Sequence, residues 1–184
     1  MHTIKNGFSI IELLVVVVIV SLLSAIAIPT YRSYQVKIKV TNAVPILSSL
    51  SDENVSRLIT DGSFPADIEL AGVTIANTAS EAVNHQNIAF VHYNGAGNKT
   101  TSYICVDLSA DTGIPNLKVG TGNTGVNNRL CMRTNIINHK AYKICGTWSA
   151  SNGYNANIPV EYLPSNCNCT SVGSSSDKTT CTAP

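Results

Sequence analysis

Residues 7–29 of the chain read Gly7-Phe8-Ser9-Ile10-Ile11-Glu12-Leu13-Leu14-Val15-Val16-Val17-Val18-Ile19-Val20-Ser21-Leu22-Leu23-Ser24-Ala25-Ile26-Ala27-Ile28-Pro29. Between Ile10 and Ile28 the only polar residues are Glu12, Ser21 and Ser24. An apolar stretch of roughly 20 residues is long enough to cross a bilayer as an α-helix. A carboxylate inside such a segment is costly unless it is paired, so Glu12 is a candidate functional residue. The alternative is that Glu12 lies near the lipid headgroups and reaches water.

The residues before the apolar run do not have the pattern of a secretory signal. They contain Lys5 and no apolar core, and no small-x-small cleavage site follows the run. Lys5 would hold this N-terminal segment on the cytoplasmic side. Arg32, Lys37 and Lys39 lie beyond the other end of the run, which fits the positive-inside rule poorly. That rule is a bias and does not decide topology alone.

Two segments of this region resemble a known family. Residues 7–13 look like the processing motif of type IV prepilins and related pseudopilins, and residues 25–34 (Ala-Ile-Ala-Ile-Pro-Thr-Tyr-Arg-Ser-Tyr) resemble the continuation found in type IVa pilins. The resemblance implies that residues 1–7 are a leader peptide, removed when prepilin peptidase cleaves between Gly7 and Phe8, and that the apolar helix is retained. It further implies methylation of the new Phe8 amine and assembly into a helical filament. It also implies an α+β fold, in which a long N-terminal helix packs on an antiparallel sheet.

This processing gives Glu12 a specific hypothesis. Cleavage creates an amine at Phe8, four residues before Glu12, so both charges would lie at the same depth in an apolar filament core. Buried charges must be paired, and breaking a buried pair costs roughly 3–5 kcal/mol. We expect the Glu12 carboxylate to meet the Phe8 amine of a neighbouring subunit, which neutralises both groups and sets the axial register.

The helix is predicted to continue well past the apolar run, over residues 8–61, with residues 8–29 as the membrane-spanning or filament-core part. From Tyr31 onward apolar residues recur on one stripe, at Val36, Val40, Val44, Leu47, Val55 and Leu58. Gly62 and Pro65 are helix stop signals. Pro29 and Pro45 each remove a backbone hydrogen bond and are expected to kink or locally unwind the helix.

The remainder, residues 62–184, is predicted to form a globular head. Residues 62–87 contain Gly, Pro and short apolar patches and are interpreted as a connector loop. Residues 88–150 are predicted to form an antiparallel sheet, with hairpins 88–93/102–108 and 130–136/141–148. Alternation places three sets of residues on an apolar face toward the helix, namely Ile104/Val106/Leu108, Leu130/Met132/Ile136 and Tyr142/Ile144/Trp148. Cys105, Cys131 and Cys145 are then expected on the opposite face.

Six cysteines in a translocated domain indicate disulfides, because the compartment beyond the membrane is oxidising. The segment from Cys145 to Cys167 is similar to the C-terminal disulfide loop of type IVa pilins, and this resemblance implies a Cys145–Cys167 bridge. If that bridge is right and the rest pair locally, Cys105–Cys131 and Cys169–Cys181 follow, giving a disulfide-bounded region over 145–181. Six cysteines allow many other connectivities.

Composition and motifs argue against several function classes. Charged residues are only 12% and the formal charge is +1, unlike the basic balance of a dedicated nucleic-acid binder. No phosphate-binding loop, metal motif or nucleophile elbow appears, so we expect neither an enzyme nor a cofactor. Cys167-Asn168-Cys169 could suggest zinc, but His85, His92 and His139 show no matching spacing. The sequons at Asn54, Asn98 and Asn168 are interpreted as chance matches.

The resemblance therefore implies a type IV pilin, stored in the bacterial inner membrane and polymerised into an extracellular fibre for adhesion, twitching motility or DNA uptake. Its expected partners are copies of itself, prepilin peptidase, the inner membrane and the pilus assembly machinery, with a host surface or DNA as further candidates. A minor pilin or a type II secretion pseudopilin remains an alternative, since the processing motif does not separate them. A remote alternative is a membrane-anchored periplasmic binding module that never polymerises.

Overall fold

The computed structural model describes residues 8–77, 79–114, 128–149, 155–156, 158–167, 169 and 172. Two compact units follow one another along the chain, Met1–Gln35 and Val36–Pro184, here called the helical unit and the head. Helix α1 (Ile10–Asp61) contributes to both units. The strands are β1 (Asp67–Leu70), β2 (Val73–Ala76), β3 (Ser80–His85), β4 (Ile88–Asn94), β5 (Thr101–Leu108), β6 (Arg129–Ile137), β7 (Lys140–Ser149) and β8 (Asn155–Ala156), with 3-10 turns η1 (Ala110–Thr112) and η2 (Val160–Tyr162). An α+β fold is confirmed.

Helix α1 ends at Asp61, where the sequence predicts the stop. Gly62 has a φ of 75°, and its N–H donates to the Leu58 carbonyl at 2.9 Å, which closes the last turn. The helix is continuous through Pro29 and Pro45, so the expected local unwinding does not occur. Around Pro45 the reason is tertiary, because buried Ala43 and Leu47 hold α1 on the sheet on both sides of that exposed proline.

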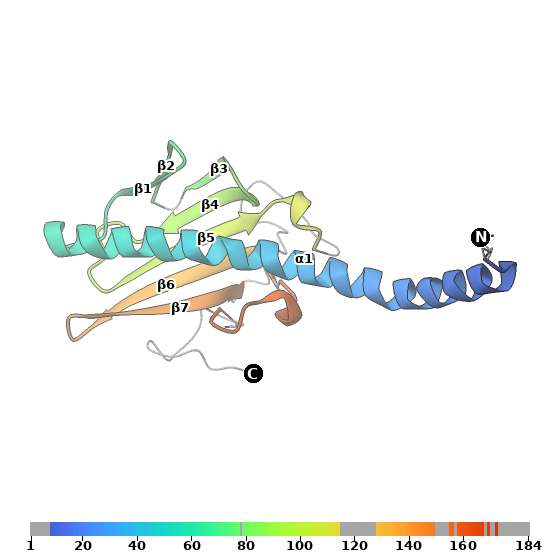
Figure 1. The fold of residues 1–184 in the computed structure, drawn as a ribbon. Coiled ribbons are helices and arrows are strands. Elements are labelled where there is room, and N and C mark those ends of the chain that lie inside the picture. The colour runs from blue at the N-terminus through green and yellow to red at the C-terminus, as the bar shows by residue number, and fades with distance from the viewer. Residues whose placement is uncertain are drawn as a thin grey trace, which may run out of the picture. The chain divides into compact units, whose positions relative to one another are not determined.

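The sheet of the head is an antiparallel meander in which β3 to β8 lie in sequence order, while β1 and β2 form a separate hairpin. Strands β4 and β5, and likewise β6 and β7, form the two predicted hairpins, each within a residue or so of its predicted ends. Asn138 and His139 both have positive φ, 51° and 63°, as a two-residue type I′ turn between β6 and β7 requires. Figure 1 shows α1 lying along this sheet within the head.

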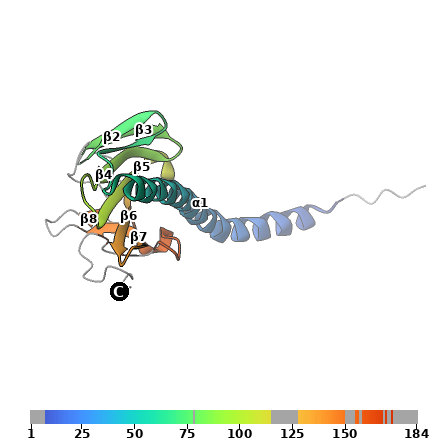
Figure 2. The same ribbon diagram turned by 90° about the vertical axis from the view of Figure 1, so that its left-hand side faces the viewer.

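The core of the head forms where one stripe of α1 meets one face of the sheet, here called the inner face. Val40 and Leu47 of α1 are fully buried in one cluster with Val106 and Leu130 of the sheet. Figure 2 shows the ribbon of this part of α1 running against the strands. The buried positions of α1 are Val36, Val40, Ala43, Leu47, Leu50, Ser51, Asn54 and Leu58. Of the predicted stripe, Val44 and Val55 are only half-buried and lie at the edge of the buried face, which is centred elsewhere on the helix than predicted.

The predicted connector over 62–87 was wrong, since it contains β1, β2 and β3. Its short apolar patches are core residues. Ile68, Ile75 and Val83 are at most 3% exposed and belong to the cluster that packs on α1. The tight turn between β1 and β2 uses Ala71 and Gly72 with φ of 52° and 80°. Gly and Pro in this segment mark turns between very short strands, a pattern that composition alone does not distinguish from a loop.

Cys145 lies on the face that we did not expect. Ile144 was predicted on the inner face with Cys145 opposite, but the register pairs Met132 with Cys145, and both belong to the core against α1. Ile144 instead packs with the Cys105–Cys131 disulfide on the other face, here called the outer face. The prediction failed because both faces of the sheet are buried here, so apolar character alone does not fix the phase of β7.

Replacing Leu47 by Ala should destabilise the head by about 2–5 kcal/mol, because the side chain is fully buried at the centre of the stripe and leaves a cavity. Urea unfolding of the detergent-solubilised chain, followed by circular dichroism, measures this loss. Ile59→Ala is the matched control, since Ile59 lies on the same helix but is 79% exposed. Equal destabilisation by both variants would contradict the packing of α1 on the inner face.

Candidate functional site

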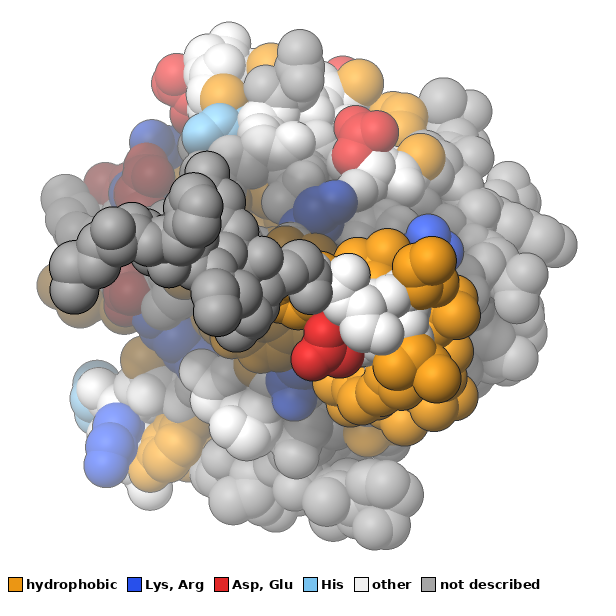
Figure 3. All heavy atoms as spheres, turned by 45° about the vertical axis from the view of Figure 1, so that its right-hand side comes forward, with side chains coloured by type: hydrophobic (Ala, Val, Ile, Leu, Met, Phe, Trp, Pro, Cys, Tyr) orange, Lys and Arg blue, Asp and Glu red, His pale blue; other side chains and the backbone are white. Residues whose placement is uncertain are grey.

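The helical unit has an apolar surface on every side. Each large apolar side chain from Phe8 to Ile28 is exposed, from 48% at Val17 to 89% at Phe8. By length and composition α1 could cross a membrane, with a mean hydropathy of 2.9 over its most apolar window. Figure 3 shows hydrophobic side chains gathered over the N-terminal part of α1. Apolar exposure of this extent requires lipid or other protein chains around it.

Two hydroxyl groups in and beside this surface are satisfied within the helix. Ser21 Oγ donates to the Val17 carbonyl at 2.6 Å, and Thr30 Oγ1 donates to the Ile26 carbonyl at 2.9 Å. Such bonds to the preceding turn remove the need for water. The surface is therefore compatible with an environment that offers no hydrogen-bond partners.

Glu12 caps the beginning of its own helix. The Ser9 backbone N–H donates to Glu12 Oε2 at 3.0 Å, and the Glu12 N–H donates to the Ser9 carbonyl at 3.1 Å. Ser9 Oγ accepts from the Ile11 N–H at 3.4 Å. Ser at the N-cap with Glu three residues later is a capping box. Our sequence reading missed this role, although the Ser-x-x-Glu spacing was visible.

Of the two residues of the predicted cleavage site, the structure describes Phe8. Phe8 is 89% exposed, directly before Ser9. Gly7 lies outside the described residues. Phe8 and Glu12 therefore lie at the same end of α1, with Phe8 directly before the capping box that Ser9 and Glu12 form.

Two disulfides join described residues of the head, one on each face of the sheet. Cys105 and Cys131 are directly opposite one another on β5 and β6, and their bond lies in the outer cluster. Cys145 of β7 bonds to Cys167, and both lie in the core against α1. Cys169 is also disulfide-bonded, and its predicted partner Cys181 lies outside the described residues.

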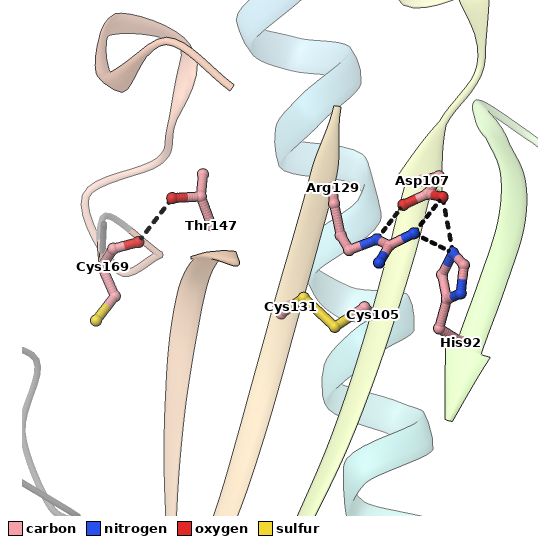
Figure 4. Close-up of a disulfide and its surroundings, with 7 residues drawn as sticks. All are labelled: His92, Cys105, Asp107, Arg129, Cys131, Thr147 and Cys169. Carbon is pink, nitrogen blue, oxygen red and sulfur yellow. Dashed lines mark hydrogen bonds and ion pairs between the residues drawn. A yellow bond between two sulfur atoms is a disulfide. The ribbon is translucent and has the colours of Figure 1, made fainter. Parts of the chain in front are cut away.

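The C-terminal segment passes onto the outer face beside β7. Cys169 accepts from the Thr147 N–H at 2.7 Å, and Val172 N–H donates to the Thr147 carbonyl at 3.1 Å. Figure 4 shows the Thr147–Cys169 contact beside the Cys105–Cys131 disulfide. Gly146 allows this approach, because a Cβ there would collide with the Cys169 backbone. Buried Val172 covers the disulfide.

A buried charged cluster lies next to that disulfide, on the outer face (Figure 4). Arg129 Nε and Nη2 donate to the two carboxylate oxygens of Asp107 at 2.6 and 2.9 Å, and His92 Nε2 lies 2.7 Å from Asp107 Oδ2. Burial alone raises the pKa of the Asp107 carboxyl, but the hydrogen bonds and charges of Arg129 and His92 together outweigh it and hold that pKa below its usual range. Sequence reading missed this cluster, because it depends on the register that sets Asp107 opposite Arg129.

The other candidate residues are separated from one another. Within the described ranges no three His, Cys, Asp or Glu side chains stand close enough to hold a metal ion. Asn54 is fully buried in α1, so its sequon is inaccessible in the folded head. Asn98 is exposed in the turn between β4 and β5, and Asn168 lies outside the described residues.

Comparison with known proteins supports one family for the whole pattern. A family model described as "Prokaryotic N-terminal methylation motif" matches residues 3–28. Type IV major pilin protein PilE of Neisseria gonorrhoeae is 31% identical over 42% of this chain and 47% of its own length. Fimbrial protein EcpC of Eikenella corrodens is 26% identical over 89% of this chain and 91% of its own. A fimbrial protein of Pseudomonas aeruginosa is 42% identical over 30% of this chain and 36% of its own. This chain is therefore similar to type IV pilins, most strongly in its N-terminal part.

Similarity to these pilins is uneven along the chain. The aligned part spans about half the length of the gonococcal pilin, 47%, and 36% of the Pseudomonas protein. The alignment with EcpC extends over nearly the whole of both proteins at lower identity. The resemblance seen in the sequence is therefore confirmed, and the long helix with an antiparallel sheet agrees with it.

Lowering the pH should destabilise the head through Asp107. The folded-state pKa of its carboxyl is depressed, so its contribution is present above the unfolded pKa of about 3.9 and is lost as pH falls from there through the folded value. Asp107→Asn should lose stability at pH 7, because buried Arg129 loses its charged partner, and should depend less on pH below about 5. Thermal unfolding of both chains between pH 3 and pH 7 measures this. Parallel pH profiles would contradict the role of Asp107.

Removing the disulfide that bounds the C-terminal region should cost about 3 kcal/mol, because the bond closes a loop of 22 residues in the unfolded chain. The double variant Cys145→Ser/Cys167→Ser, compared with wild type by urea unfolding, measures this loss. Non-reducing peptide mapping of the wild type supplies the control for pairing. A map that joins Cys145 to any other cysteine would overturn the expectation.

Proposed function

We propose that this chain is a structural subunit of a type IV pilus, stored in the bacterial inner membrane and assembled into a surface filament. The observation that carries the proposal is the apolar surface from Phe8 to Ile28, which is exposed on every side. Near its beginning lies the Glu12 carboxylate, which caps the helix. In the single subunit this surface suits lipid. Packed against copies of itself, the same surface would form a filament core.

Processing would complete the assembly end of the helix. We propose that prepilin peptidase cleaves between Gly7 and Phe8 and that the Phe8 amine is methylated, as the match of residues 3–28 to the methylation motif supports. The new amine would lie one residue before Ser9, whose backbone N–H already donates a hydrogen bond to Glu12. Glu12 Oε2 makes that bond, and Oε1 has no partner among the described residues, so it is available to the amine of a neighbouring subunit.

The relatives favour a filament-building subunit over a minor pilin or pseudopilin. Those compared here are a major pilin and two fimbrial proteins, one of them similar over nearly its whole length. The proposed role is structural, and assembly rather than turnover is its mechanism. Adhesion, twitching motility or DNA uptake would be carried out by the filament, through the head surfaces that remain outside after assembly.

Two substitutions of Glu12 separate its charge from its capping role. Glu12→Gln keeps the capping bond to Ser9, because Gln also serves at the third position of a capping box, but it removes the charge. Glu12→Ala removes both. We expect both variants to form at least about tenfold fewer filaments, since the loss of a buried pair costs roughly 3–5 kcal/mol. Sheared fibres, quantified against membrane-stored subunit, provide the measurement.

The outcomes differ for each role. If Glu12→Gln assembles as well as wild type while Glu12→Ala does not, Glu12 acts only as a helix cap, and the charge pair is wrong. Mass spectrometry of the sheared fibres tests the proposed function itself. A chain that begins at methylated Phe8 and dominates the fibres supports it, and a processed chain that is absent from the fibres contradicts it.

A further inference from the structure

The apolar surface of the helical unit ends abruptly in a short polar and aromatic band. Tyr31 and Tyr34 are 63% and 62% exposed, and Arg32 is exposed between them. Gln35 Nε2 donates to Tyr31 Oη at 2.6 Å. We call Tyr31, Arg32, Tyr34 and Gln35 the girdle. At about 100° per residue its side chains cover an arc of roughly 160° around α1, with Ser33 on the opposite side.

The position of the girdle along the helix matches the edge of a bilayer. Ile10–Ile28 is roughly 28 Å long at about 1.5 Å per residue, close to the ~30 Å of a hydrocarbon core. Tyr31 then lies about 4–5 Å beyond Ile28, and Tyr34 about 9 Å beyond it. The interfacial layer of headgroups is roughly 5–8 Å thick on each side. Tyr31 and Arg32 would therefore lie among the headgroups, and Tyr34 at their outer edge, when the apolar segment spans the membrane.

The side chains of the girdle fit the chemistry of that layer. Tyrosine has an apolar ring and a polar hydroxyl, and it is enriched at membrane–water interfaces. The guanidinium of Arg32 can donate two parallel hydrogen bonds to a phosphate. Among the described residues Arg32 has no acidic partner, so its N–H donors are available to a phosphate.

Charge favours lipid over a second copy as the occupant. Glu12 is the one acidic residue in the described part of the helical unit, residues 8–35, and it lies at the other end. Copies standing side by side in a membrane would bring Arg32 next to Arg32 without a carboxylate between them. Phospholipid phosphates supply the missing negative charge.

We propose that the girdle binds the glycerol and phosphate groups of phospholipids at the periplasmic leaflet and so fixes the depth at which the subunit is stored. This proposal rests on the membrane storage proposed above. It assigns Tyr31, Arg32 and Tyr34 a role before assembly, at the opposite end of the apolar segment from Glu12.

Depth-dependent fluorescence quenching tests this in full-length protein reconstituted into phosphatidylcholine vesicles. Trp148→Phe removes the single native tryptophan, and Ala25→Trp places a reporter just inside the hydrocarbon edge. Lipids brominated at shallow or deep acyl carbons quench it according to its depth. We expect Tyr31→Ala/Arg32→Gln/Tyr34→Ala to change the ratio of shallow to deep quenching at least about twofold. Ser33→Ala, at the same depth but outside the girdle, should leave the ratio unchanged.

Further arms identify the occupant. In vesicles of an uncharged galactolipid, Arg32→Gln alone should have no effect, whereas in phosphatidylcholine it should shift the ratio. In protein with the unsubstituted girdle, the ratio of shallow to deep quenching should not depend on how much protein each vesicle holds. If it changes with the protein-to-lipid ratio, a neighbouring copy is the occupant and the proposal is overturned. The proposal is also overturned if the proteins with the wild-type girdle and with the triple substitution give equal ratios of shallow to deep quenching. A second reporter, Val18→Trp, tests whether the apolar segment spans the bilayer. If deep bromines quench it strongly but the girdle substitutions change no ratio, only this inference fails. If no bromine quenches it, the proposed membrane storage fails.

Discussion

The packing of one stripe of α1 on the inner face of the sheet is the constraint on which the rest of this structure depends. Val40 and Leu47, fully buried, fix which strand residues point toward the helix and which point away. That choice sends the Cys105–Cys131 disulfide and the charged cluster to the outer face. It also leaves α1 anchored in the head from Val36 onward, so the preceding residues need no contact with the sheet to remain helical.

Helix α1 meets two environments with two patterns. Before Pro29 its side chains are apolar all round, which suits lipid or a filament core, and after Val36 they are apolar on one stripe, which suits a sheet. Glu12, Ser9 and Ser21 of the first part find their hydrogen-bond partners locally, in the Ser9–Glu12 cap and in the bond from Ser21 to the preceding turn. A subunit built in this way can change surroundings without losing backbone hydrogen bonds.

Strong periodic signals predicted much of this structure, and weak ones did not. The apolar run, the stop at Gly62 and the two long hairpins were predicted from sequence because each depends on neighbouring residues. The strands within 62–87 were missed because each is so short that its turns outweigh its alternation. The phase of β7 and the cluster of Asp107 with Arg129 depend on cross-strand register, which a single sequence does not specify where both faces are buried. The Ser9–Glu12 cap was predictable and was overlooked.

The C-terminal segment crosses from one side of the sheet to the other within a few residues. Cys167 is in the inner core and Cys169 in the outer cluster, so the backbone wraps the border of β7, where Gly146 leaves room for it. An open strand border would invite another chain to add to it. Subunits stored together in a membrane are confined to a plane, where encounters between heads are frequent. Where the segment wraps β7, the backbone N–H and carbonyl of Thr147 are already bonded to Cys169 and Val172, so that part of the border has no backbone group left for a strand of another subunit.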